Sequence, residues 1–138
     1  PDRNALCLDC GTAITWEAVD ANGRLRGGAI APGRRLMRRA LHEYTAQLPL
    51  LEMDNSEPPE IGADTATAIR CGVDRGCLGL VREVLAGIRM ALGDRDCPCL
   101  ATGGDAPFFV AHLPELKAAG LDFTLRGIAL AWELNHAR

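Results

Sequence analysis

The amino-acid sequence predicts an α/β domain in which helices cover both faces of a mixed five-stranded sheet. Two short apolar runs, residues 5–9 and 98–102, are typical of buried strands. Asn22-Gly23 is the dipeptide of a tight hairpin turn and predicts a pair of antiparallel strands around it. From residue 64 to residue 92, apolar side chains recur on one face of a helix. The resulting element order, βββααβαβα, combines strands and helices as a layered α/β domain does.

The first half of the chain carries three strands and one helix. The strands are expected at residues 5–9, 13–19 and 24–30. Pro32-Gly33 opens the helix, and Leu48-Pro49 should end it, because the residue before a proline disfavours helical geometry. Four arginines of this helix predict a solvated basic face: Arg34, Arg35, Arg38 and Arg39.

The second half of the chain follows a polar, proline-bearing loop at residues 50–62. Asp64 or Thr65 is expected to cap the long helix that ends near residue 92. Because glycines interrupt this helix, we expect either a break near Gly72 or a close packing contact there. The remaining expected elements are a strand at 98–102, a helix at 107–119 broken at Pro114, a strand at 121–124 and a helix at 125–136.

Length, charge and cysteine content narrow the class of protein. A chain of 138 residues has the size of one domain, and its net charge of −3 gives no reason to expect a nucleic-acid partner. No apolar run approaches the roughly 18 residues of a membrane span, so no membrane partner is expected. The start lacks both signal-peptide character and an initiator Met, which suggests a trimmed chain. Among six cysteines, Cys7 and Cys10 form the single CxxC pair, so we expect buried, reduced thiols and a cytoplasmic protein rather than a zinc site.

Two glycine-bearing turns at strand ends have the composition of phosphate-binding loops. Asp9-Cys10-Gly11-Thr12-Ala13 joins two strands, and Thr102-Gly103-Gly104-Asp105-Ala106 joins a strand to a helix. Glycines let successive main-chain N–H groups approach a phosphate, and a threonine hydroxyl adds another donor. Since Asp9 would repel a phosphate, its expected role is to hold a cation that offsets phosphate charge. Each segment taken alone is also compatible with an ordinary turn.

The order of these motifs resembles the second domain of type III pantothenate kinases, over nearly the whole chain from Ala5 to Leu134. The segments that carry the resemblance are Asp9-x-Gly-Thr-Ala-x-Thr15, Gly27-Gly28-x-Ile30-x-Pro32-Gly33, Leu36-Met37, Thr45-Ala46-x-Leu48-Pro49, Gly62-x-x-Thr65-x-x-Ala68-Ile69-x-x-Gly72, Thr102-Gly103-Gly104-Asp105 and Gly127-Ile128-Ala129-Leu130. The resemblance implies a ribonuclease-H-like (actin-like ATPase) fold of the acetate-kinase and sugar-kinase superfamily. It also implies ATP-dependent phosphorylation of pantothenate, the first step towards coenzyme A.

The same resemblance implies roles for individual residues. Asp9 would hold a monovalent cation, K⁺ or NH₄⁺, and Thr65 would contact pantothenate. The residues implied in ATP binding are Gly11, Thr12, Gly103, Gly104 and Asp105. The implied cofactors are ATP, the monovalent cation and Mg²⁺, and the implied assembly is a homodimer with the substrate site near the subunit boundary.

The sequence departs from the family pattern in two places. Family members have a first domain with its own Asp-x-Gly-Asn phosphate turn, and this chain is expected to lack that N-terminal lobe. They also carry a Gly-x-Asp-Arg motif whose aspartate is the catalytic base. Asp2-Arg3 matches its last two residues, but only five residues separate Arg3 from Asp9, where the family has a helix. Residues 1–4 are therefore interpreted as the loop that enters the first strand, the catalytic base is unknown, and the chain alone is expected to turn over little or nothing.

The residues leave two other functions open. Asp9, Glu17 and Asp20 could form the carboxylate cluster of a ribonuclease-H-like nuclease with two divalent metals, although the acidic net charge offers no nucleic-acid groove. The apolar helix at residues 64–92 is long enough for a non-catalytic dimerisation or regulatory module.

Overall fold

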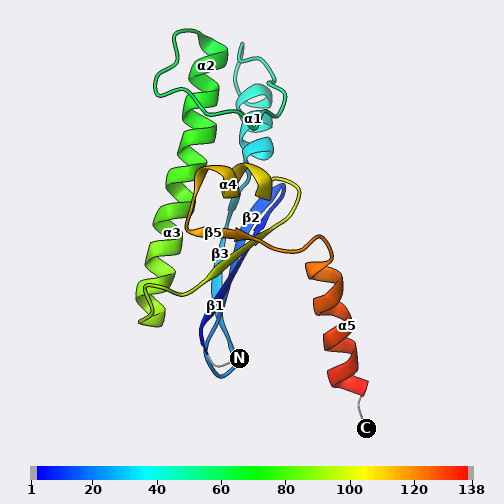
Figure 1. Ribbon diagram of the computed structural model, residues 1–138. Helices are drawn as coiled ribbons and strands as arrows, with labels where there is room; N and C mark the ends of the chain where they lie inside the picture. Colours follow the sequence, from blue (N-terminus) through cyan, green and yellow to red (C-terminus); the bar gives the residue numbers. More distant parts are fainter. Residues whose placement is uncertain (1–2, 137–138) are drawn as a thin grey trace.

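The computed structural model describes residues 3–136, which form one five-stranded sheet accompanied by helices, the last of which stands away from the sheet and has no buried residue (Figure 1). The strands are β1 (Ala5–Cys10), β2 (Ala13–Val19), β3 (Leu25–Pro32), β4 (Cys99–Thr102) and β5 (Leu116–Ala118). Their order in the sheet is β3-β2-β1-β4-β5, with antiparallel pairing among β1, β2 and β3 and parallel pairing among β1, β4 and β5. The predicted α/β class and mixed five-stranded sheet are confirmed.

The helices lie on both sides of this sheet. They are α1 (Arg34–Glu43), α2 (Thr65–Arg70), α3 (Gly76–Leu92), α4 (Ala106–His112) and α5 (Phe123–His136). Helix α3 runs alongside the sheet, whereas α5 leaves β5 on the other side (Figure 1). A cavity of about 960 Å³ lies between α5 and the outward side chains Cys7, Asp9 and Glu17. Within residues 3–136, no helix is both long and apolar enough to cross a membrane.

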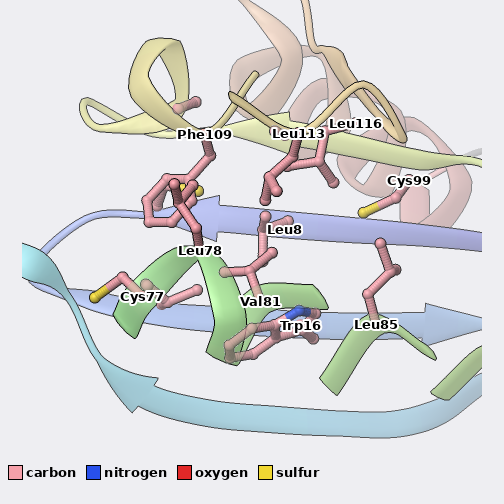
Figure 2. Packing of buried hydrophobic residues seen from close by; sticks show 14 of the residues in the cluster. Leu8, Trp16, Cys77, Leu78, Val81, Leu85, Cys99, Phe109, Leu113 and Leu116 are labelled. Atoms are coloured by element: carbon pink, nitrogen blue, oxygen red, sulfur yellow. The ribbon is translucent and has the colours of Figure 1, made fainter. Parts of the chain in front are cut away.

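The core follows from the alternation of side chains along the central strands. Leu6, Leu8 and Cys10 of β1 point to the buried face, while the residues between them point outward. Figure 2 shows Leu8 and Trp16 of the sheet packed among apolar side chains of α3 and of the α4 region. Each fully buried side chain of this size contributes roughly 1.5–3 kcal/mol of transfer free energy. This packing fixes the positions of the strand ends that carry the two predicted turns.

The long helical segment contains a local change of winding instead of a break. Asp64 caps α2 by accepting a hydrogen bond from Thr67 N at 2.8 Å, as predicted. The π-helical turn η1 (Cys71–Arg75) then joins α2 to α3. A Cβ atom on Gly72 would meet nothing within 4 Å, so the alternative of a close packing contact there is wrong. Single π-helical turns inside α-helices occur frequently at functional sites.

Three element boundaries differ from those that the sequence predicts. The fifth strand lies at Leu116–Ala118 instead of 121–124, because β5 forms by parallel pairing with β4 and owes little to its own apolar pattern. The helix expected at 107–119 ends at His112, since Pro114 keeps Leu113 extended. Helix α1 ends at Glu43, several residues before the predicted stop at Leu48-Pro49.

Candidate phosphate-binding site

The two predicted turns lie side by side at one end of the sheet. Strands β1 and β4 are parallel neighbours with Asp9 opposite Thr102, so both turns leave the sheet at the same edge. Asp105 N donates a hydrogen bond to Cys10 O at 2.9 Å and joins the second turn to the first. Gly103 has a φ of +92°, which favours glycine, and it packs against Cys10 and the Asp9 carboxylate.

The turns enclose a cavity of about 350 Å³ that we name the phosphate pocket. Its lining consists of Gly11, Thr12, Arg35, Met53, Asn55, Gly104 and Asp105. Four of these residues belong to the sequence-predicted set, and the structure brings them together from positions more than 90 residues apart in the chain. The other three come from α1 and from the loop before α2.

Main-chain N–H groups are the donors that this end of the sheet offers. Gly11 N donates to Ala13 O at 2.9 Å, so the first glycine shapes its turn with its amide already engaged. Thr12, Gly103 and Gly104 have no main-chain or side-chain acceptor for their N–H groups among residues 3–136. Unpaired main-chain N–H groups are the kind of donor that anion-binding concavities use.

Asp9 lies beside this pocket and outside its lining. Its side chain points to the exposed face of β1, opposite to the buried Cys10. Together with Thr102 and Gly103 it lines a neighbouring cavity of about 630 Å³. A carboxylate in this place is accessible to solvent cations and adjoins the phosphate pocket through Gly103.

Thr65 occupies a different part of the molecule. It is exposed at the start of α2 and lines an open, mostly apolar cavity of about 880 Å³, which we name the apolar cavity. The residues that share this lining include Met37, Leu41 and Tyr44 from the α1 region and Ile69, Gly72 and Val73 from the α2–η1 region. The structure therefore separates Thr65 from the five residues predicted for ATP.

The alternative carboxylate cluster is not assembled. The antiparallel register places Asp9 at the turn end of β1, whereas Asp20 follows Val19 at the opposite end. Asp20 accepts hydrogen bonds from the N–H groups of Asn22 and Arg24, and the second of these contributes most to lowering the pKa of its carboxyl group. Asp20 therefore stabilises the β2–β3 hairpin. Within the described part of the chain, no three His, Cys, Asp or Glu side chains lie close enough to hold one metal ion.

The solvated arginine face predicted for α1 is wrong for two of its four members. Arg34 and Arg38 have relative exposures of 0% and 1%, and both contact Asp74, which is also fully buried. Arg34 Nε lies 3.5 Å from Asp105 Oδ2 at the edge of the phosphate pocket. Burial raises the pKa of the Asp105 carboxyl group, and the nearby Arg34 charge opposes that increase.

Sequence reasoning missed three residues of the phosphate pocket. Arg35 was assigned to a solvated face, and it is exposed, but the first turn of α1 aims it at the pocket. Met53 and Asn55 lie in the loop at residues 50–62, where no motif marks them. The signal that could have identified Arg35 is its place two residues after Gly33, at the start of a helix that begins beside the first turn, where Gly33 N donates to Thr12 O at 2.9 Å.

The chain entering β1 lies at the other end of the sheet. Asn4 Nδ2 donates to Asp94 Oδ2, and Asn4 Oδ1 accepts from Ala21 N, both at 3.0 Å. Asn4 therefore lies near the β2–β3 hairpin, at the end of β1 away from the phosphate pocket. Asp2, the residue that matches the family's catalytic aspartate, lies outside the described residues.

Comparison with known proteins identifies the same family along most of the chain. The family model described as type III pantothenate kinase matches residues 1–87. The type III pantothenate kinase of Chlorobium luteolum is 40% identical over 134 residues, covering 94% of this chain and 49% of that protein. Those of Treponema pallidum and Cereibacter sphaeroides are 39% and 38% identical over 124 and 135 residues, covering 90% and 96% of this chain and 44% and 51% of the relatives.

A solved structure agrees with the fold. It is a conserved protein from Campylobacter jejuni whose name assigns it to the Baf family of transcriptional activators. Its TM-score is 0.72 at 18% identity, and the match covers 99% of this chain and 60% of that chain. The chain spans about half the length of the curated relatives it matches. On the family model and these relatives, the chain belongs to the type III pantothenate kinase family.

Proposed function

We propose that this chain supplies one lobe of an enzyme that transfers the γ-phosphoryl group of ATP to pantothenate. The observation that carries the proposal is the phosphate pocket, where two turns present main-chain N–H groups without an acceptor in the described residues. Phosphoryl transfer depends on positioning and charge neutralisation more than on covalent chemistry, and such turns supply both. The names of the curated relatives reported above support pantothenate as the acceptor.

In this proposal the pocket residues bind the triphosphate. The N–H groups of Thr12 and Gly104 donate to phosphate oxygens, and the Thr12 hydroxyl adds a donor. Arg35 supplies the positive charge, since it lines the pocket and forms no ion pair within residues 3–136. Gly11 and Gly103 shape the turns. Asp105 lines the same pocket and is the N-cap residue of α4.

The positions of the cations in this proposal follow from the oxygen ligands that each cavity offers. Hard cations take oxygen ligands, and Asp9 and Thr102 offer a carboxylate and a hydroxyl to one cavity. We assign a monovalent cation, K⁺ or NH₄⁺, to Asp9, and we expect Mg²⁺ to arrive bound to the phosphates of ATP. A cation at either position supplies neutralisation of phosphate charge. Asp9 holds its carboxylate on the exposed face, and no Lys or Arg of residues 3–136 forms an ion pair with it, although Arg126 lines the larger cavity on that face.

The acceptor side of the proposal rests on Thr65. It lines the apolar cavity, where its hydroxyl is a polar group in a largely apolar wall. Such a wall suits the aliphatic part of pantothenate, while the hydroxyl fixes its polar end. The general base for the acceptor hydroxyl and the opposing phosphate contacts belong, in this proposal, to an N-terminal lobe. The 138 residues alone therefore turn over little or nothing.

The proposal extends to assembly and compartment. A homodimer is supported by the apolar surface of α5, whose large side chains such as Leu125, Ile128 and Trp132 are exposed. Sedimentation of the chain tests this part. The cytoplasm is supported by six free cysteines, which suit a reducing compartment.

A coupled ADP-release assay with pantothenate tests the function. One sample is the 138-residue chain, and the other joins it to the half of the C. luteolum kinase that has no counterpart here. We expect background turnover by the chain and pantothenate-dependent ADP release by the chimera. Robust turnover by the chain alone contradicts the one-lobe proposal, and a folded but inactive chimera contradicts the kinase proposal.

A further inference from the structure

A fully buried cluster of three charged side chains connects the phosphate pocket to the interior. Arg34 and Arg38, one helical turn apart on α1, both contact Asp74 of η1. Arg38 Nη2 donates to Asp74 Oδ1 and Oδ2 at 2.8 and 2.6 Å, and Arg34 Nε lies 3.3 Å from Asp74 Oδ1. We name these residues the Arg–Asp–Arg cluster.

Arg34 is the member of this cluster that reaches the phosphate pocket. Its Nε lies 3.5 Å from Asp105 Oδ2, and its Nη2 donates to Asp54 O at 2.7 Å. Asp105 lines the pocket, and Asp54 directly precedes the lining residue Asn55. One guanidinium therefore contacts two segments that contribute to the pocket, the second turn and the loop before α2.

The aromatic ring of Phe108 fixes the plane of that guanidinium. Arg34 Cζ lies 3.5 Å from the ring centroid, a stacked cation–π contact on the first turn of α4. Arg38 lacks this geometry: besides Asp74 it donates to Glu52 O and contacts neither Asp105 nor Phe108. The two arginines share one partner and one degree of burial, but only Arg34 touches the second turn.

The π-helical turn determines where Asp74 lies, and so where the Arg–Asp–Arg cluster forms. It lies in the π-helical turn, whose residues Gly72 and Val73 line the apolar cavity together with Thr65. The extra residue of a π turn alters the direction of the side chains that follow. Asp74 thus holds the two arginines on one side of η1, while its neighbours form the wall of the apolar cavity.

Charge balance explains why a phosphate pocket would need such a cluster. Asp105 places a half-buried carboxylate beside the N–H groups that would bind the triphosphate, and like charges repel. The Arg34 charge compensates that carboxylate from behind. Stability alone does not account for the cluster, because buried ion pairs are often replaceable by apolar residues without loss of stability.

We propose that Arg34 is a positioning residue of the phosphate pocket, held in place by Asp74, and that it sets the distance between the 103–105 turn and the 53–55 wall. This inference rests on the proposed nucleotide site and deepens it. Arg34 touches no substrate, so it acts through Asp105 and Asp54. Its loss weakens binding of ATP, and an equal change at Arg38 does not.

Titration of the 138-residue chain with Mg·ATP, followed by amide chemical shifts, tests the proposal. Arg34→Lys keeps the charge but loses the planar fork, and we expect the dissociation constant for ATP to rise about tenfold. Arg38→Lys is the matched control, with an expected change of less than about twofold. Urea unfolding should show a loss of unfolding free energy for both variants, since both lose guanidinium contacts to Asp74.

An apolar replacement separates positioning from folding. In the triple variant Arg34→Met, Arg38→Met and Asp74→Leu, the fully buried charges are removed together, and only the partly exposed Asp105 loses an ion-pair partner, so we expect a folded protein. Its ATP affinity should nevertheless fall at least as far as that of Arg34→Lys. This variant answers the question even if Arg34→Lys does not fold.

The outcomes distinguish failure of the proposed nucleotide site from failure of the positioning role of Arg34. If the unmodified chain does not bind Mg·ATP at all, the proposed nucleotide site is refuted, and the inference falls with it. If the unmodified chain binds and the Arg34→Lys and triple variants bind equally well, the inference is overturned and the proposed site stands. Equal loss of affinity in Arg34→Lys and Arg38→Lys also overturns it, since that result assigns the cluster to stability.

Discussion

Replacing Gly103 by alanine perturbs the contact between the two turns. Gly103 has a φ of +92°, and a Cβ atom there would lie 2.5 Å from Cys10 O and 2.8 Å from Cys10 C, with the Asp9 carboxylate also in contact. The left-handed conformation costs a non-glycine residue about 1–2 kcal/mol. Overpacking against main-chain atoms adds about 1–3 kcal/mol. The reduced freedom of the unfolded chain offsets about 0.4–1 kcal/mol of this.

The expected net loss for Gly103→Ala is therefore about 2–4 kcal/mol of unfolding free energy. For a urea slope of about 1.5 kcal/mol per M, a loss of about 3 kcal/mol lowers the unfolding midpoint by about 2 M. Gly104→Ala is the matched control, because a Cβ atom on Gly104 meets nothing within 4 Å and its φ is not positive. Equal midpoints for the two variants would refute the described contact between the turns. In the folded fraction of Gly103→Ala, we also expect weaker binding of Mg·ATP.

Three further predictions concern charge and thiol chemistry. Arg35→Gln should weaken ATP binding about tenfold at low salt, because Arg35 lines the phosphate pocket. Arg39→Gln removes an exposed partner of Glu43 and should leave ATP binding unchanged. Binding titrations at two salt concentrations check both expectations. The N–H of the first turn of α2 lowers the pKa of Asp64, so its stabilisation is present above the ordinary carboxyl range and is lost as pH falls through the lowered value. Urea unfolding of Asp64→Ala and the unmodified chain should therefore differ more at about pH 7 than at about pH 3. Burial raises the pKa of Cys77 to about 11, so mass spectrometry after alkylation of the native chain near pH 7.5 should find this thiol unmodified, in contrast to the chain in urea.

The turn residues were predictable from the sequence because their chemistry is local. Gly11, Thr12, Gly103 and Gly104 are marked by residue type and by their place after apolar strands. The parallel pairing of β1 with β4 then brings both turns to one edge, which the βαβ order already suggests. The capping role of Asp64 was predictable for the same reason.

The buried Arg–Asp–Arg cluster beside the pocket was not predictable, because its members are distant in sequence. A guanidinium is normally placed in solvent unless its counter-ion is known, and Asp74 lies 36 residues after Arg38. The spacing of Arg34 and Arg38, one turn apart on α1, is equally compatible with a buried and with a solvated face. The fifth strand was missed because Leu116–Ala118 has only one buried side chain and forms by pairing with β4.

A structure of this chain with Mg²⁺ and a non-hydrolysable ATP analogue tests the central claim most directly. The claim predicts phosphate oxygens within about 3 Å of the N–H groups of Thr12 and Gly104, with Arg35 turned towards them. A triphosphate bound in the apolar cavity beside Thr65, or anywhere that leaves those two N–H groups without an acceptor, would contradict the account.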